Sequence, residues 1–262
     1  MKRLFRWFLS LFNWKPKVIV VKPVLEVEVC TLKPDLRLPM AARRRPKRTT
    51  TTTSTTTTLV PGETTSSTTT QAPSGGNKVM LFFEFNGGSS QTSGWNGGRK
   101  IDYAASTLNS ADREQAMMTV EAGYSRYNVI ITNSRDAFNA HTGLKQEIIV
   151  TPTSAWYTNT SYTGVAFIGG LGGGQPAWVF EDRLGYRWDY VGDIMVHESG
   201  HTLGLRHQSQ YDQACALVAS YRQGCHMGYP YNQDAQWING TTYSCTTYQD
   251  DDAILAQKLG LK

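Results

Sequence analysis

The stretch HESGHTLGLRH, residues 197–207, holds three of the chain's five histidines, at spacings of four and six residues. Residues four apart on an α-helix lie one turn above each other, so His197 and His201 can point at one ion. A continued helix would carry His207 about 9 Å further along and about 240° around the axis. We therefore expect the helix to end at Gly204, because glycine accepts left-handed backbone angles at little cost.

Two imidazoles on one helix face are a usual ligand pair for zinc. With His207 as third ligand, a fourth tetrahedral position stays open for water and substrate, which is typical of catalytic zinc. Glu198 lies about 100° around the helix from His197, near the metal without binding it. Because zinc lowers the pKa of its water from about 15.7 to near 7, Glu198 can take the proton of that water as general base.

The pattern H-E-x-x-H-x-x-G-x-x-H resembles the zinc site of the metzincin metalloproteases. The resemblance implies a methionine in a tight turn beneath the metal, and Met227 in CHMGYP (225–230) lies at a suitable distance. Tyr229 is then either an additional zinc or transition-state ligand or an ordinary packed tyrosine. Gln208 differs from the residues that better-known subfamilies carry after the third ligand, which leaves the subfamily open. Further segments resemble secreted, mostly bacterial, reprolysin-like metzincins, namely MLFFEFNGG, GWNGG, IIVTPTSAWY, GVAFIGG, WVFEDRL and WINGTTYSCTTYQDDDAI.

This resemblance implies a zinc-dependent metalloendopeptidase that hydrolyses peptide bonds by a metal-activated water. It also implies that AWVFED (177–182) is the edge strand that holds an extended peptide. The alternative is a surface-tethered binding or adhesion module that retains the zinc site with little or no proteolysis. The expected cofactor is one catalytic Zn²⁺. Asp250, Asp251 and Asp252 offer carboxylates to Ca²⁺, but helix capping accounts for them and calcium has no further support.

The order of the expected elements predicts a mixed α/β (α+β) domain over residues 78–262. Apolar β-branched runs predict strands, and helical periodicity with capping residues predicts helices. The first helix has Ser110 as its expected N-cap, with Glu114 near the capping-box position. We expect a zincin-like fold, which is a twisted mixed sheet with an antiparallel edge strand, an active-site helix and a C-terminal helix. Strands are expected at 79–85, 128–134, 147–153, 164–170 and 177–182, and helices at 110–127, 184–205 and 250–260.

The first 77 residues differ in composition from the rest. Residues 1–50 hold 13 Lys and Arg against 3 Asp and Glu, whereas the remainder holds 13 against 18. Residues 1–48 form a basic region that begins with either an amphipathic membrane-surface helix or an atypical export signal. VIVVKPVLEVEVC (18–30) is either an extended segment docked on the body or part of a propeptide. Residues 49–77 are a Thr- and Ser-rich linker, too polar to build a core.

This layout predicts a secreted or surface-tethered protein whose partner is a protein or peptide substrate. The mildly acidic body gives no electrostatic reason to expect nucleic-acid binding. Contact with a membrane surface through residues 1–17 is the one further partner, and the oligomeric state is left open. Cys30, Cys215, Cys225 and Cys245 include no C-x-x-C pair, which argues against a cysteine zinc site. Export favours one disulfide among the last three, with free thiols as the alternative and the pairing open.

Overall fold

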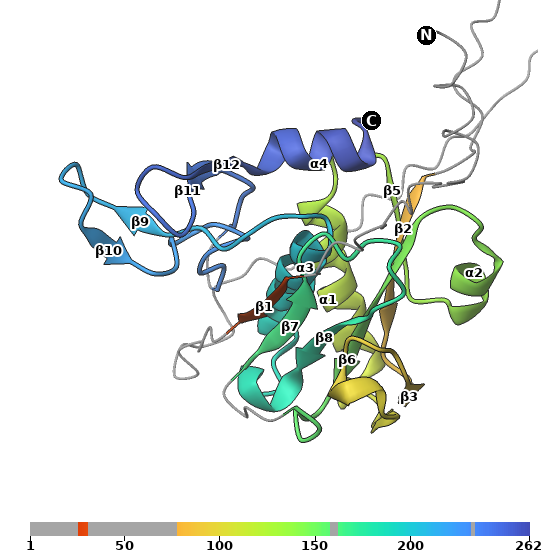
Figure 1. Ribbon diagram of the computed structural model, residues 1–262. Coiled ribbons are helices and arrows are strands. Elements are labelled where there is room, and N and C mark those ends of the chain that lie inside the picture. Colours follow the sequence, from red (N-terminus) through yellow and green to blue (C-terminus); the bar gives the residue numbers. More distant parts are fainter. Residues whose placement is uncertain (1–25, 31–77, 158–161, 232–233) are drawn as a thin grey trace, which may run out of the picture.

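A six-stranded mixed sheet forms the centre of the molecule, in the order β1-β7-β8-β6-β2-β5 (Figure 1). The computed structural model describes residues 26–30, 78–157, 162–231 and 234–262. Strands β5, β2, β6 and β8 are parallel, whereas β7 is antiparallel to β8 and β1 is antiparallel to β7. The predicted mixed sheet with an antiparallel edge is thus confirmed. The strands are β1 (Val27–Cys30), β2 (Val79–Glu84), β5 (Val129–Thr132), β6 (Lys145–Thr151), β7 (Gly164–Phe167) and β8 (Ala177–Phe180).

The prediction that AWVFED (177–182) forms the edge strand of the sheet was wrong. AWVFED forms β8, which pairs with β6 on one side and with β7 on the other. Both β7 and β8 are buried along their whole length, so their apolar content does not reveal which of them lies further out. β7 lies outside β8 and carries β1 on its other side. Strand β1 comes from the segment 18–30, whose described residues 26–30 dock on the body.

Two long helices cover one face of this sheet (Figure 1). α1 (Ser110–Gly123) and α3 (Trp188–Thr202) pack against each other, and α3 also lies against β6, β7 and β8. The expected cap of α1 was off by one residue, because the side chain of Asn109 accepts a hydrogen bond from the Asp112 N–H. α4 (Asp251–Leu259) follows the prediction, with Asp250 as its N-cap. The short helix α2 (Arg135–Ala140) and the 3₁₀ turns η2 (Asn96–Gly98) and η3 (Glu181–Leu184) were not expected.

Side chains alternate between two apolar clusters, one on each face of the sheet. Ile148 and Val150 of β6 face the helices, whereas Ile149 between them faces the opposite cluster. That second cluster contains Trp95 and Ile101, from the region of the hairpin β3 (Gly88–Ser90) and β4 (Ile101–Tyr103). In β7, Ala166 belongs to the helix-side cluster, and Val165 and Phe167 belong to the other one. Ala166 therefore points toward α3, whereas Val165 and Phe167 point to the opposite face of the sheet.

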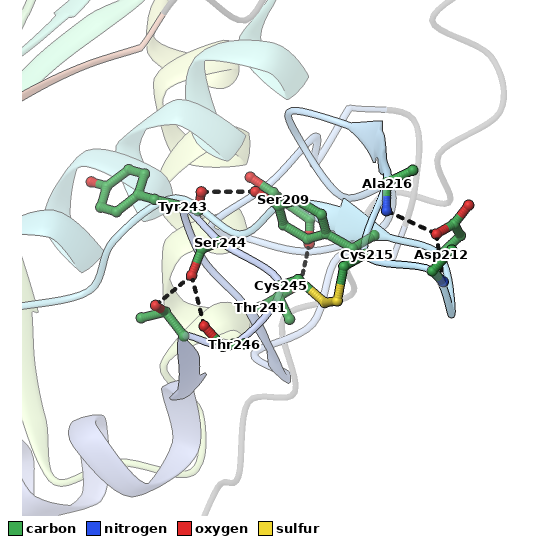
Figure 2. Close-up of a disulfide and its surroundings, with 12 residues drawn as sticks. Ser209, Asp212, Cys215, Ala216, Thr241, Tyr243, Ser244, Cys245 and Thr246 are labelled. Carbon is green, nitrogen blue, oxygen red and sulfur yellow. Dashed lines mark hydrogen bonds between the residues drawn. A yellow bond between two sulfur atoms is a disulfide. The ribbon is translucent and has the colours of Figure 1, made fainter.

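The described residues after α3 form four short strands in two antiparallel pairs, and a disulfide links the loops of the two pairs. Cys215 and Cys245 are bonded, with their Cα atoms 5.4 Å apart (Figure 2). Cys225 is a buried free thiol. The bond links the loop beside β10 to the segment between the last two strands, which also carries Tyr243. The strands are β9 (Gln210–Tyr211), β10 (Leu217–Ala219), β11 (Asn239–Thr241) and β12 (Tyr248–Asp250).

Several predictions for the N-terminal third are not tested. The expected membrane-surface or export segment at 1–17 and the Thr-rich linker at 49–77 lie outside the described residues. Among the residues that are described, no helix is both long enough and apolar enough to cross a bilayer.

The disulfide gives a stability prediction. Replacing both Cys215 and Cys245 by serine should lower the free energy of unfolding by about 2–4 kcal/mol, because the bond restricts the unfolded chain. The two cysteines are separated by 30 residues in sequence. Equilibrium unfolding in urea measures the change, and the wild type in reductant is the control. An unfolding curve identical to that of the oxidised wild type would show that the bond does not form.

Candidate metal centre

The three histidines of the motif converge on one point. His197 and His201 lie on α3 and are fully buried, and His207 follows the helix and is 6 % exposed. Their Nε2 atoms are 3.1 Å (His197 to His201), 3.2 Å (His201 to His207) and 3.0 Å (His197 to His207) apart. Within the part of the chain that the structure describes, this is the one group of His, Cys, Asp or Glu side chains arranged to hold a metal ion.

The chain turns back after α3 at the glycine where a break is needed. Gly204 has a φ of 107°, in the region that favours glycine. The Leu205 N–H donates to the Gly200 carbonyl at 3.1 Å, and the Gly204 N–H donates to the His201 carbonyl at 2.9 Å. This pair of hydrogen bonds is a Schellman motif, which ends a helix and reverses the chain. The expected helix end at Gly204 is confirmed, and it brings His207 back to the helix face.

Hydrogen bonds fix which nitrogen of each imidazole carries the proton. Nδ1 of His197 lies 2.6 Å from the His226 carbonyl, and Nδ1 of His201 lies 2.8 Å from the Leu205 carbonyl. Nδ1 of His207 lies 2.7 Å from a carboxylate oxygen of Glu28. Carbonyl and carboxylate oxygens only accept, so all three Nδ1 atoms donate. When a ring is neutral and Nδ1 carries its proton, Nε2 is unprotonated and has a free lone pair. The three Nε2 atoms face one another.

This arrangement fits a divalent cation. Three unprotonated nitrogens cannot hydrogen-bond to each other, whereas nitrogens bound to one tetrahedral zinc at 2.0–2.1 Å lie about 3.3 Å apart. Burial and the neighbouring imidazoles hold the pKa of His197 well below its usual value. Burial, and then the neighbouring imidazole of His207, lower the pKa of His201 to about 3. The two rings on α3 are thus neutral at physiological pH, as metal ligands must be.

Glu198 is buried beside this cluster without a protein partner. Its side chain is fully buried, and neither carboxylate oxygen has a hydrogen-bond partner among the described residues. Burial, and then the negative charge of Glu28, raise its pKa well above the usual value. A methyl group built on Gly164, the first residue of β7, would overlap this carboxylate and lie 2.7 Å from its Cγ. The carboxylate therefore lies directly against the start of β7.

The turn that contains Met227 lies under α3. The Gly228 N–H donates to the Cys225 carbonyl at 3.0 Å, which closes a tight turn over residues 225–228. Met227 is fully buried, and a methyl group built on Gly200 of α3 would lie 2.7 Å from its sulfur. Tyr229, two residues after Met227, is half-buried, with its ring centroid 5.1 Å from that of Tyr231. Met227 is thus placed beneath the helix turn that carries His201.

Several residues around the cluster could not be identified from the motif. The carboxylate of Glu28 also accepts a hydrogen bond from Tyr243 at 2.5 Å. Burial alone would raise the pKa of Glu28, but the hydrogen bonds from His207 and Tyr243 help to bring it down to about 2. Tyr221 packs edge-on against His207, with ring centroids 5.0 Å apart. These residues carried no sequence signal except the alternation of Glu and Val in EVEV.

Gln208, the residue after the third histidine, ties the ligand loop to the last helix. Its amide donates to the Asp251 carboxylate at 2.8 Å and to the Ile238 carbonyl at 2.9 Å. Asp250 caps α4, and Asp252 binds Arg126 and Tyr127. Each of the three aspartates thus has a structural role within the protein, so a calcium ion is not needed to explain their presence.

Comparison with known proteins identifies one family. A family model described as metallo-peptidase family M12B, reprolysin-like, matches residues 101–251, which is more than half of the chain. The matched span contains the whole histidine motif and the turn at Met227. No curated protein matches the chain.

Metal binding can be tested with two buried histidines. His207→Ala should weaken zinc binding by more than the 10- to 100-fold that is typical of losing an outer-sphere contact. His226→Ala is the matched control, because His226 contributes only its backbone carbonyl to His197. Competition with a chromogenic chelator measures both affinities. Equal losses in the two variants would contradict the assignment of the three ligands.

Proposed function

This chain belongs to the reprolysin-like metallopeptidases of family M12B, and we propose that it is a zinc-dependent endopeptidase. The observation that carries the proposal is the convergence of three imidazole Nε2 atoms within 3.2 Å of one another. A buried carboxylate without a protein partner lies beside them. Three ligands leave one tetrahedral position open, which is the arrangement of hydrolytic zinc centres.

His197, His201 and His207 would hold the ion through their Nε2 atoms. Zinc, when bound, acidifies the attacking water and stabilises negative charge on the substrate carbonyl oxygen. The Nδ1 hydrogen bonds to the His226 and Leu205 carbonyls orient the rings of His197 and His201 and strengthen them as ligands.

Glu198 is the proposed general base. Its burial keeps it basic, and the attraction of a nearby cation favours its ionised form, so it can accept the proton of the attacking water. The same carboxyl group then donates this proton to the nitrogen of the leaving amine. Because the carboxylate lies against Gly164, the scissile bond would lie at the start of β7.

Two further roles belong to this proposal. Met227 would support the site from below as an apolar, polarizable floor, without binding the metal. Tyr229 as an additional zinc or transition-state ligand remains a prediction, which its packing against Tyr231 does not test. The disulfide is compatible with the oxidising environment of a secreted or surface-tethered protein.

Removing the base should abolish peptide hydrolysis while leaving the metal in place. For Glu198→Gln in the full chain, we expect casein cleavage to fall by about 10²- to 10⁴-fold, because proton transfer is lost. The exposed Glu121 on α1 is the matched control as Glu121→Gln. If zinc-loaded wild type cleaves no more than Glu198→Gln, the chain is a binding module that retains a zinc site.

The substitution Gly164→Ala should impair the same proton transfer by Glu198. In Gly164→Ala the added carbon overlaps the carboxylate of Glu198, so the carboxylate must move. We expect kcat to fall about tenfold or more, since small displacements of catalytic groups are costly. Zinc content and thermal unfolding should stay near those of the wild type. Unchanged kcat would show that the position of Glu198 against β7 does not matter.

A further inference from the structure

Strand β1 covers the outer edge of β7. It pairs antiparallel along the full strand, from Val27 opposite Phe167 to Cys30 opposite Gly164. The Ile168 N–H extends the pairing by donating to the Glu26 carbonyl at 2.8 Å. The end of β1 therefore lies across from Gly164, the residue that contacts the carboxylate of Glu198.

This edge is the one that a peptide substrate needs under the proposed function. An extended peptide binds an open strand edge through main-chain hydrogen bonds. β7 runs past the three-histidine cluster. Gly164, at the start of the strand, contacts Glu198. Beyond the end of the strand, the Gly169 N–H donates to the His201 carbonyl at 2.8 Å. One strand edge has room for a single partner strand, so β1 and a substrate cannot both bind it.

Two glutamates on β1 meet fixed partners on the body. Glu26 binds Arg206 with two contacts of 2.5 and 2.8 Å. Glu28, two residues later and on the same side of the strand, binds His207 at 2.7 Å and Tyr243 at 2.5 Å. Val29, on the opposite side, packs against the cluster of Val165 and Phe167.

The backbone of Arg206 is held in place independently of β1. The side-chain amide of Gln249 accepts from the Arg206 N–H at 2.8 Å and donates to its carbonyl at 2.9 Å. The guanidinium group also lies 5.5 Å from the centre of the Tyr243 ring. A guanidinium group on this fixed backbone, next to a metal ligand, can pair with an acidic side chain on an extended partner.

We propose that the outer edge of β7, together with Arg206 and Tyr243, binds extended segments with acidic side chains at alternate positions. Strand β1 is its tethered occupant and competes with peptide substrates. This inference rests on the proposed peptidase function. A tethered competitor lowers the fraction of molecules that can bind substrate, so it raises KM and leaves kcat unchanged.

Charge reversal in the full chain tests the competition. Glu26→Arg places like charges opposite each other, so we expect KM for an uncharged peptide to fall about three- to tenfold at constant kcat. The double variant Glu26→Arg/Arg206→Glu should return KM toward the wild-type value, and Glu121→Arg on α1 should leave it unchanged. A KM that stays the same or rises in Glu26→Arg would overturn the proposal and make β1 a purely structural strand.

A peptide supplied in trans tests the recognition of acidic side chains. Acetyl-Glu-Val-Glu-Val-amide, the sequence of residues 26–29, should inhibit the Glu26→Arg chain competitively. The matched peptide with both glutamates replaced by glutamine should inhibit at least about tenfold more weakly, because charged hydrogen bonds are lost. Equal inhibition by both peptides, or by neither, contradicts the proposed site.

Hydrogen exchange separates this proposal from the peptidase function. The Ile168 amide should exchange slowly in the wild type and faster in Glu26→Arg, whether or not either chain cleaves peptides. Slow exchange in both would show that β1 does not leave β7 and would overturn the proposal. Altered exchange without any cleavage that depends on Glu198 would instead contradict the peptidase function.

Discussion

Three imidazole lone pairs that face one another at 3.0–3.2 Å are the interaction on which this structure depends. Without a cation between them such lone pairs repel, and burial denies them water as a partner. The surrounding residues nevertheless hold them there, since each Nδ1 is fixed by an oxygen acceptor. Much of the buried polar structure near α3 is explained by the need to keep these rings oriented and close.

Other parts of the fold serve the same purpose. The Schellman motif at Gly204 reverses the chain, and the turn at Met227 provides the carbonyl that orients His197. Gln208 joins the ligand loop to α4 through Asp251, whose pKa is raised to about 7, chiefly by burial. The sheet contributes through β7, which lies against both Glu198 and the end of α3. The centre is therefore assembled from segments that are far apart in the sequence.

The sequence predicted those features that depend on local geometry. Helical spacing identified His197 and His201, and the glycine at 204 indicated the reversal that brings in the third ring. It could not show that Glu28 reaches His207 or Tyr243, because Glu28 and Tyr243 are 215 residues apart and no periodicity connects them. The choice of AWVFED as edge strand was wrong for a physical reason. Two neighbouring buried strands have the same apolar pattern, and only pairing shows which one lies outside.

The coordination of the bound metal is the most direct measurement of this account. X-ray absorption at the zinc edge of the natively purified full chain should show three nitrogen ligands at about 2.0–2.1 Å and one oxygen ligand, with no sulfur. The nitrogen signal should match imidazole. Zinc that is bound by sulfur, or a native chain that holds no divalent metal, would contradict the account.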